Sequence, residues 1–174
     1  MKHEAIKDIL GGEPDRTVTA CGWVRTRRQA KGFSFIEIND GSSFAGLQVV
    51  VNDDLPNYDS EIAQLGTGAS VGVVGTAVAS PGAEQEIELQ AHEVTVFGQV
   101  RGDEYPLQKK RIGFERLREL AHLRPRTNTF GAMTRVRHAL ARATHDFFDD
   151  RGFYYLHTPI ITAGDCEGAG EMFQ

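Results

Sequence analysis

Cysteine is scarce in this sequence, and long apolar runs are missing from it. The two cysteines, Cys21 and Cys166, belong to no CxxC or Cys/His spacing, so neither a disulfide framework nor a zinc site is indicated. No apolar run approaches the ~18 residues that a transmembrane helix needs. The opening residues, MKHEAIKDIL, carry charges of both signs and no signal-peptide core. These features predict a cytoplasmic protein with no metal site and no membrane partner.

Basic residues are few in the first part of the chain. Residues 1–100 hold 7 Lys and Arg against 14 Asp and Glu, whereas residues 101–174 hold 12 against 10. An acidic total disfavours a protein that coats nucleic acid non-specifically, and DNA is not an expected partner. Four of the seven bases nevertheless fall together, at Arg25, Arg27, Arg28 and Lys31. This cluster fits a local anionic ligand, and it fits the solvated end of a hairpin equally well.

Five runs rich in β-branched and aromatic residues occupy residues 17–97, each bounded by Gly, Asn, Asp, Ser or Pro. Between the third and fourth runs, Tyr58, Ile62 and Leu65 recur at helical spacing. Five strands with a helix between the third and fourth form the layout of the OB-fold, a Greek-key barrel whose face binds oligonucleotides. The sequence therefore predicts an all-β, five-stranded OB-fold barrel over residues 1–100.

Alternation along the second and third runs predicts which side chains face outward. With Ile36 and Ile38 inside the barrel, Phe33 and Phe35 point out, and the alternating aliphatic residues of the third run leave Gln48 outside. Exposed rings beside arginines suit single-stranded RNA, because bases stack on the rings and phosphates bind guanidinium groups. An amide can both donate to and accept from a base edge. Alternatively, the two phenylalanines pack under the N-terminal segment.

The second half of the chain is predicted to be an α/β segment after an exposed linker, residues 101–127. FERLRELAHL reads as a helix that Pro125 separates from the next one, which Thr127 or Asn128 can cap. A long helix from about Thr129 to Asp150 carries a wide apolar stripe, which by itself indicates core packing. Residues 128–174 are therefore expected to start a second domain.

The helix is followed by a glycine, a short aromatic strand and a loop. Gly152 is expected to end the helix, Phe153 to begin the strand and Pro159 to stop it. Glu167 lies in the glycine-interrupted loop CEGAGEMF, where a carboxylate is by default solvated. The order of these pieces, which stops short of a complete domain, leads us to expect a longer protein of which this is the N-terminal portion.

Three motifs resemble the class II aminoacyl-tRNA synthetases. CGWVRTRRQAKGFSFIEIND with LQVVV resembles the anticodon-binding barrel of their aspartyl, asparaginyl and lysyl group, while AHLRPRTN and CEGAGEMF are similar to the bacterial asparaginyl enzymes. The resemblance implies that Phe35 stacks on an anticodon base, that Gln48 reads the central uridine and that Arg28 lies at the RNA-facing edge. It places Phe33 and Arg25 on the same surface.

The resemblance also implies roles for the C-terminal part. Gly152, Phe153 and Pro159 would belong to motif 1, through which these enzymes form homodimers, and Glu167 would bind the α-ammonium group of the amino acid. The family activates asparagine with ATP and Mg²⁺ and transfers it to tRNA(Asn). Its catalytic motifs 2 and 3 are not found in this sequence, so no catalytic residue is assigned and residues 1–174 alone are expected to be inactive.

Two other functions remain open from the sequence. The first is the aspartyl enzyme of the same group, since the residues that separate asparagine from aspartate come later in the family. The second is a free-standing tRNA-binding OB-fold protein without catalysis.

Overall fold

The computed structural model describes residues 2–82, 85–100, 104–108, 110 and 112–161. It contains two compact units, residues 1–132 and 133–174. Within the described residues, no helix is both long and apolar enough to cross a membrane.

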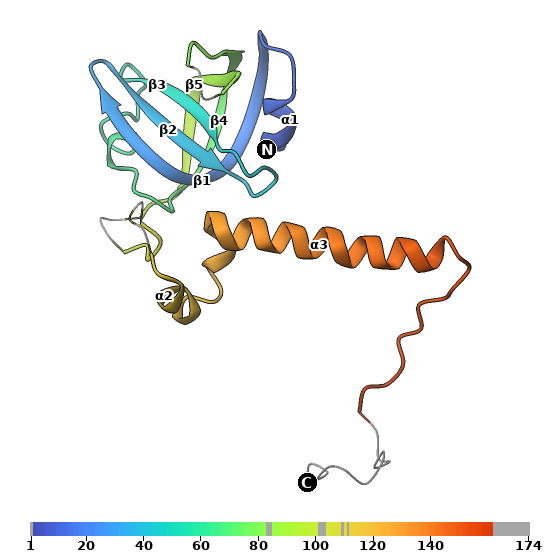
Figure 1. The fold of residues 1–174 in the computed structure, drawn as a ribbon. Helices are drawn as coiled ribbons and strands as arrows, with labels where there is room; N and C mark the ends of the chain where they lie inside the picture. Colours follow the sequence, from blue (N-terminus) through green and yellow to red (C-terminus); the bar gives the residue numbers. More distant parts are fainter. Residues whose placement is uncertain (1, 83–84, 101–103, 109, 111, 162–174) are drawn as a thin grey trace. The chain divides into compact units, whose positions relative to one another are not determined.

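The first unit is built on a closed five-stranded barrel, as the sequence predicted (Figure 1). Its strands are β1 (Arg16–Ala30), β2 (Phe33–Asn39), β3 (Leu47–Asn52), β4 (Ser70–Ala79) and β5 (Ile87–Gly98). They are hydrogen-bonded in the order β1-β2-β3-β5-β4. All neighbouring pairs are antiparallel except β3 and β5, which are parallel. This strand order is the Greek-key arrangement of an OB-fold.

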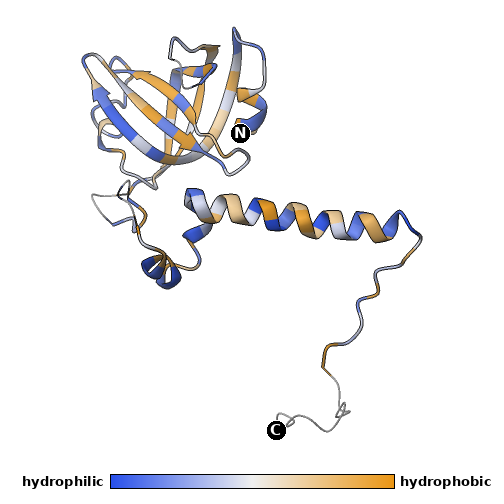
Figure 2. Ribbon diagram, in the orientation of Figure 1, coloured by the Kyte–Doolittle hydropathy of each residue, from blue (hydrophilic) through white to orange (hydrophobic). Residues whose placement is uncertain are grey.

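The alternation of the strands determines the barrel interior. Ile36 and Ile38 of β2 are at most 2% exposed, and Leu47, Val49 and Val51 of β3 are completely buried. Figure 2 shows apolar stretches along these strands, interrupted by a few polar positions. Because successive side chains of a strand point to opposite faces, the residues between them must face outward. The predicted register of β2 and β3 is therefore confirmed.

Two short helical segments contribute to the barrel core. The first, α1 (Ile6–Leu10), was not predicted, and it buries Ile6 and Ile9 completely. The second is a 3₁₀ turn, η1 (Ile62–Gln64), where the sequence predicted a short helix; Tyr58, which precedes it, is buried and shares a hydrogen bond of 2.7 Å with Ser34. The helical spacing therefore identified the buried residues correctly but overestimated the length of the helix.

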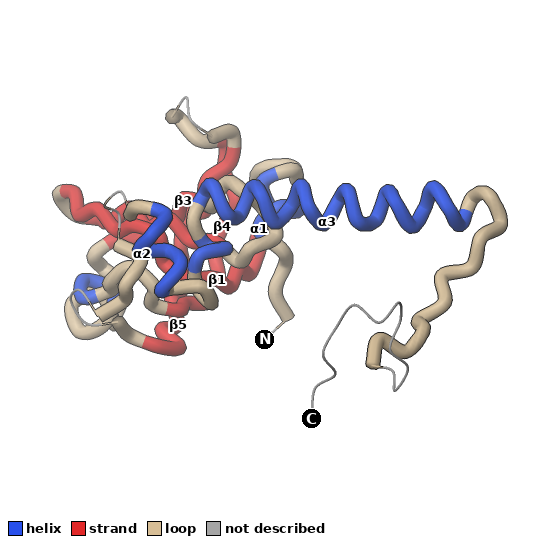
Figure 3. The backbone as a smooth tube through the Cα atoms, turned by 60° about the horizontal axis from the view of Figure 1, so that its bottom comes forward, coloured by secondary structure: helices blue, strands red, loops and turns tan. Residues whose placement is uncertain are grey.

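The linker region contains α2 (Phe114–Glu119) and a 3₁₀ turn, η2 (Arg124–Arg126), in which Pro125 takes one of the first two positions. Next comes α3 (Asn128–Asp149), whose start is marked by the hydrogen bond from the Gly131 N–H to the Thr127 carbonyl, 2.7 Å. Figure 3 shows the helices and the loops that join them. Pro125 lies between the two helices as predicted, but α2 ends at Glu119, earlier than the predicted run FERLRELAHL. The long helix is confirmed.

The chain after α3 differs from its prediction. Gly152 adopts a φ of +80°, which suits glycine and ends the helix as expected. Residues 153–161, however, form no strand in the described part of the chain. A strand needs a hydrogen-bonded neighbour, and the described residues offer none to this segment. An aromatic, β-prone composition alone is thus not enough to form a strand here.

Candidate nucleic-acid interface

The outer face of β1 and β2 carries a pair of rings with a guanidinium group against them. Phe33 and Phe35 are in edge-to-face contact, with ring centroids 5.0 Å apart and planes at 85°. The β1–β2 register places Arg28 opposite Phe35, and the Arg28 guanidinium carbon lies 4.9 Å from that ring's centroid. This arrangement places two partly exposed aromatic rings next to a positive charge, a combination that suits an unpaired nucleotide.

The alternative that both phenylalanines are covered by the N-terminal segment is not what the structure shows. Both rings are only partly buried. The N-terminal helix instead docks through Ile6 and Ile9 in the core, and its first turn is held by Asp40, whose Oδ2 accepts a hydrogen bond from the Ile6 N–H at 2.9 Å. The ring pair therefore remains available on the outer surface.

Gln48 lies on the same outer face, and its amide is held by a carboxylate. The β2–β3 register pairs Gln48 with Glu37, two residues along β2 from Phe35. Gln48 Nε2 donates to Glu88 Oε2 at 3.1 Å. Because a carboxylate accepts hydrogen bonds but cannot donate one, this contact turns the amide nitrogen toward Glu88. Among the residues that the structure describes, none bonds to the second N–H or to the carbonyl oxygen, which are left for a ligand.

Glu88 is a site residue that was not predicted from the sequence. It is only 5% exposed, although it lies on the outer side of β5 next to the inward-facing Leu89. Its carboxylate accepts hydrogen bonds from Gln48, from Gln90 Nε2 at 2.9 Å and from Ser80 Oγ at 3.3 Å. A buried carboxylate without partners would be costly, and these three donors offset that cost. Its only signal in the sequence is a charged residue between Ile87 and Leu89, which is also the pattern of an ordinary solvated position.

Arg25 does not join the other predicted interface residues. Strand β1 has a bulge between Val24 and Thr26, so Arg25 is the extra residue that faces no partner in β2. Its guanidinium donates to the Arg126 carbonyl at 2.9 Å and to Asn128 Oδ1 at 3.2 Å. The side chain therefore contacts the linker and the start of α3 rather than the Phe35 group.

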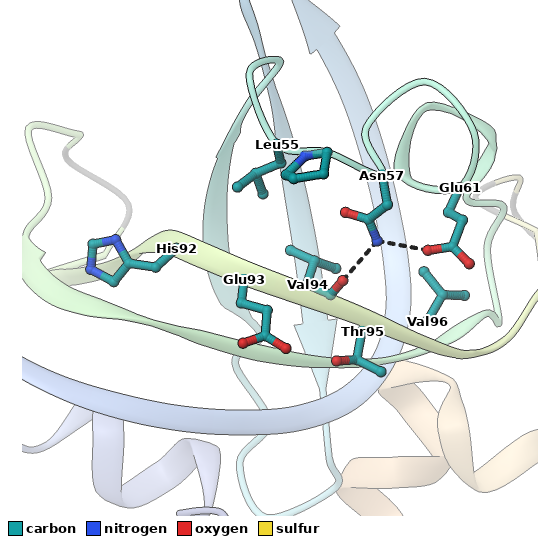
Figure 4. Close-up of a pocket in the computed structure, with 9 residues that line it drawn as sticks. Leu55, Asn57, Glu61, His92, Glu93, Val94, Thr95 and Val96 are labelled. Atoms are coloured by element: carbon teal, nitrogen blue, oxygen red, sulfur yellow. Dashed lines mark hydrogen bonds between the residues drawn. The ribbon is translucent and has the colours of Figure 1, made fainter.

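A hollow of about 360 Å³ lies elsewhere on the barrel, between β5 and the loop after β3 (Figure 4). Asn57 lies across it and donates both to Glu61 Oε2 at 2.6 Å and to the Val94 carbonyl at 2.9 Å. Glu61 and Glu93 give its lining two negative charges. A polyanion such as RNA would be repelled there, so this hollow is no part of the candidate interface.

The remaining predicted residues belong to the end of the chain. Gly152, Phe153 and Pro159 are exposed, and Glu167 lies outside the described residues. Helix α3 also presents large apolar side chains to solvent, namely Met133, Val136, Leu140, Phe147 and Phe148.

Comparison with known proteins identifies relatives of both parts. Residues 18–97 match the family described as OB-fold nucleic acid binding domain. The chain is 58% identical over 174 residues to an asparagine–tRNA ligase of Nostoc sp., an alignment that covers 99% of this chain and 38% of the relative. It is 54% identical to an asparagine–tRNA ligase of Desulfitobacterium hafniense, covering 100% of this chain and 38% of the relative.

Solved structures show the same fold. The asparaginyl-tRNA synthetase of Pyrococcus horikoshii in complex with asparaginyl-adenylate superposes with a TM-score of 0.84 at 23% identity, over 97% of this chain and 39% of that one. The chain thus spans well under half the length of the relatives that it matches.

Proposed function

We propose, on the premise that residues 18–97 are an OB-fold nucleic acid binding domain of the tRNA anticodon-binding family, that this chain provides the anticodon-binding part of an asparagine–tRNA ligase. The observation that carries the proposal is the position of the Arg28 guanidinium over the Phe35 ring, on the same outer face as the amide of Gln48. Identities of 52% to 58% to asparagine–tRNA ligases support the asparaginyl enzyme over the aspartyl one.

In the proposed complex, each of these three side chains has one task. An unpaired anticodon base stacks on Phe35, and Arg28 neutralises a neighbouring phosphate. Gln48 reads the central uridine, whose N3–H needs an acceptor and whose O4 needs a donor. The amide supplies both groups, and its bond to Glu88 fixes their order in space, so that rotation of the amide would sacrifice that bond.

The binding proposal is tested with anticodon stem-loop RNAs that carry either uridine or cytidine at the central position. Gln48→Ala is expected to reduce the preference for uridine. Its affinity for the cytidine RNA, the weaker ligand, should change little. Gln29→Ala removes an exposed amide from the far end of β1 and serves as the matched control. Equal loss of affinity for both RNAs in Gln48→Ala would exclude the readout role.

The activity of the whole protein is part of the same proposal. It would activate asparagine with ATP and Mg²⁺ and transfer it to tRNA(Asn) in the cytoplasm, with Glu167 binding the ammonium group of the amino acid. Among the described residues, no group of three or more His, Cys, Asp or Glu side chains could hold a metal ion. ATP and Mg²⁺ are therefore proposed as ligands of the whole enzyme, outside the part of the chain that the structure describes.

Dimerisation is proposed through α3 and the segment that follows it, which includes Gly152, Phe153 and Pro159. Val136 and Leu140 are 58% and 63% exposed on α3, and such a stripe is buried when a second copy packs against it. Leu140→Glu should shift the protein toward the monomer in sedimentation velocity. His138→Glu, which helical periodicity places on the opposite side of α3, should leave the association unchanged. A wild-type chain that stays monomeric at all concentrations would contradict the proposal.

A further inference from the structure

The carboxylate of Glu88 anchors two glutamine amides, and only one of them has a role in the proposal above. Gln48 Nε2 donates to Oε2, whereas Gln90 Nε2 donates to Oε1 at 2.9 Å. The amide nitrogen of Gln90 must likewise face the carboxylate, since its carbonyl oxygen cannot donate a hydrogen bond. The two amides are therefore held in the same way by the two oxygens of one buried group.

Gln90 also lies on the proposed RNA-binding face. Phe35 is paired with Val50 across β2 and β3, and Val50 is paired with Gln90 across β3 and β5. The neighbouring Leu89 is completely buried, so Gln90 must face outward. Among the described residues, none donates a hydrogen bond to the carbonyl oxygen of Gln90 or of Gln48. Each amide thus keeps one acceptor and one donor for a ligand.

We infer that Gln90 is a second base-reading residue, which recognises the anticodon nucleotide on the 3′ side of the central uridine. This inference rests on the proposed function. The amide of Gln90 has the same chemistry as that of Gln48 and the same anchor, so it suits the same base. By the genetic code, asparagine anticodons carry uridine at both positions, whereas aspartate anticodons end in cytidine.

The anchor gives Gln90 a means to distinguish these two bases. Uracil presents O4 as an acceptor and N3–H as a donor, whereas cytosine presents the reverse order, with a 4-amino donor and an N3 acceptor. A free amide could turn over to suit either edge. Gln90 would lose its bond to Glu88 by turning, and this leaves a buried carboxylate short of a partner.

The test compares the chain with its Gln90→Met variant, which keeps the length of the side chain and removes both polar atoms. Binding is measured to four stem-loops. The parent has the anticodon GUU, and each of the three variants has cytidine at one of the three anticodon positions. Wild type should bind the third-position variant about tenfold more weakly than the parent, and Gln90→Met should abolish that difference while it keeps the central-position difference. His92→Ala, on the same strand and exposed, is the matched control.

The outcomes separate this inference from the proposed function. If wild type does not prefer the parent at any position, the proposed function and the inference fail together. If wild type discriminates at all positions and Gln90→Met still discriminates at the third, the inference alone fails. Loss of discrimination confined to the first position would also overturn it.

A change in the RNA keeps the test valid if Gln90→Met proves unstable. A parent stem-loop with 3-methyluridine at the third position lacks the N3–H and blocks that edge. Wild type should bind it about tenfold more weakly than the parent. Equal affinity for the methylated and unmodified RNAs would overturn the inference without any substitution in the protein.

Discussion

Arg126 of the linker lies over the indole of Trp23 of β1, with its guanidinium carbon 4.4 Å from the ring centroid. The same arginine donates to the Tyr105 hydroxyl at 3.3 Å, and its carbonyl accepts the hydrogen bond from Arg25. Tyr105 in turn packs against Gly68, where an added Cβ would come within 2.6 Å of the ring. These contacts join the linker to the barrel at one point.

Because Trp23 is the only tryptophan in the sequence, its fluorescence reports on this contact directly. Arg126→Ala should shift the emission to longer wavelength, since loss of the guanidinium exposes more of the indole to water. The stability should fall by no more than about 1 kcal/mol, as expected for a cation–π contact near the surface. Arg118→Ala, exposed on α2, is the control and should leave the spectrum unchanged. An unshifted spectrum in Arg126→Ala would mean that the contact is not maintained in solution.

The aromatic surface predicts a second effect of substitution. Phe35→Ala should weaken binding of the anticodon stem-loop by about 1–3 kcal/mol, the range of a base stacked on an aromatic ring. Phe44→Ala removes a ring that is 55% exposed outside the interface and should change the affinity little. Fluorescence anisotropy of labelled RNA measures both. Similar losses in the two variants would point to non-specific binding to exposed rings.

The close approach of β4 and β5 predicts that substitution of one glycine lowers the stability of the barrel. Gly75 lies at a register shift, and a Cβ there would overlap the carbonyl oxygen of Gln90. Gly75→Ala must displace β5 backbone, and a cost of about 1–3 kcal/mol is expected. Gly82→Ala is the control, because among the described residues its Cβ would meet only Ser80 Oγ, at 3.5 Å. Urea denaturation measures the difference, and equal stabilities would contradict the close approach.

Much of the barrel could be predicted from the sequence because alternation is a local signal. Ile36 and Ile38 set the register of β2, and with it the outward position of Phe35. The stacking of Arg28 on Phe35 then follows from the pairing of β1 with β2. Each of these steps uses only the period of a strand and the order of its neighbours.

The parts that could not be predicted depend on tertiary structure. A bulge leaves no mark in the hydrophobic pattern, so Arg25 was expected among the RNA-binding residues although its side chain contacts the linker. The burial of Glu88 depends on donors from β3, from β5 and from Ser80, the residue after β4, which no local pattern connects. The strand expected from Phe153 onward needs a pairing partner that the described residues do not supply.

The hydrogen bonds to the Asp40 carboxylate predict a pH dependence of the folding stability, which a single substitution can isolate. Burial raises the pKa of its carboxyl group, but hydrogen bonds from the Ser42 hydroxyl and from the Ile6 and Ser42 N–H groups outweigh this, so the pKa lies below its ordinary value. The unfolded chain therefore binds the proton more readily than the native one. The contribution of Asp40 is fully present above the ordinary pKa of about 4 and is lost as the pH falls through the lower native pKa.

Asp40→Asn should accordingly destabilise the protein at neutral pH, with a difference from wild type that shrinks as the pH falls below about 4. Other carboxylates also affect acid stability, but they act on both proteins alike, so the difference between the two isolates Asp40. Asp54→Asn, an exposed acidic position in the loop after β3, is the control and should show no such trend. Chemical denaturation between pH 3 and pH 7 gives both curves. A difference that stays constant over this range would show that Asp40 holds the start of α1 by its shape rather than by its charge.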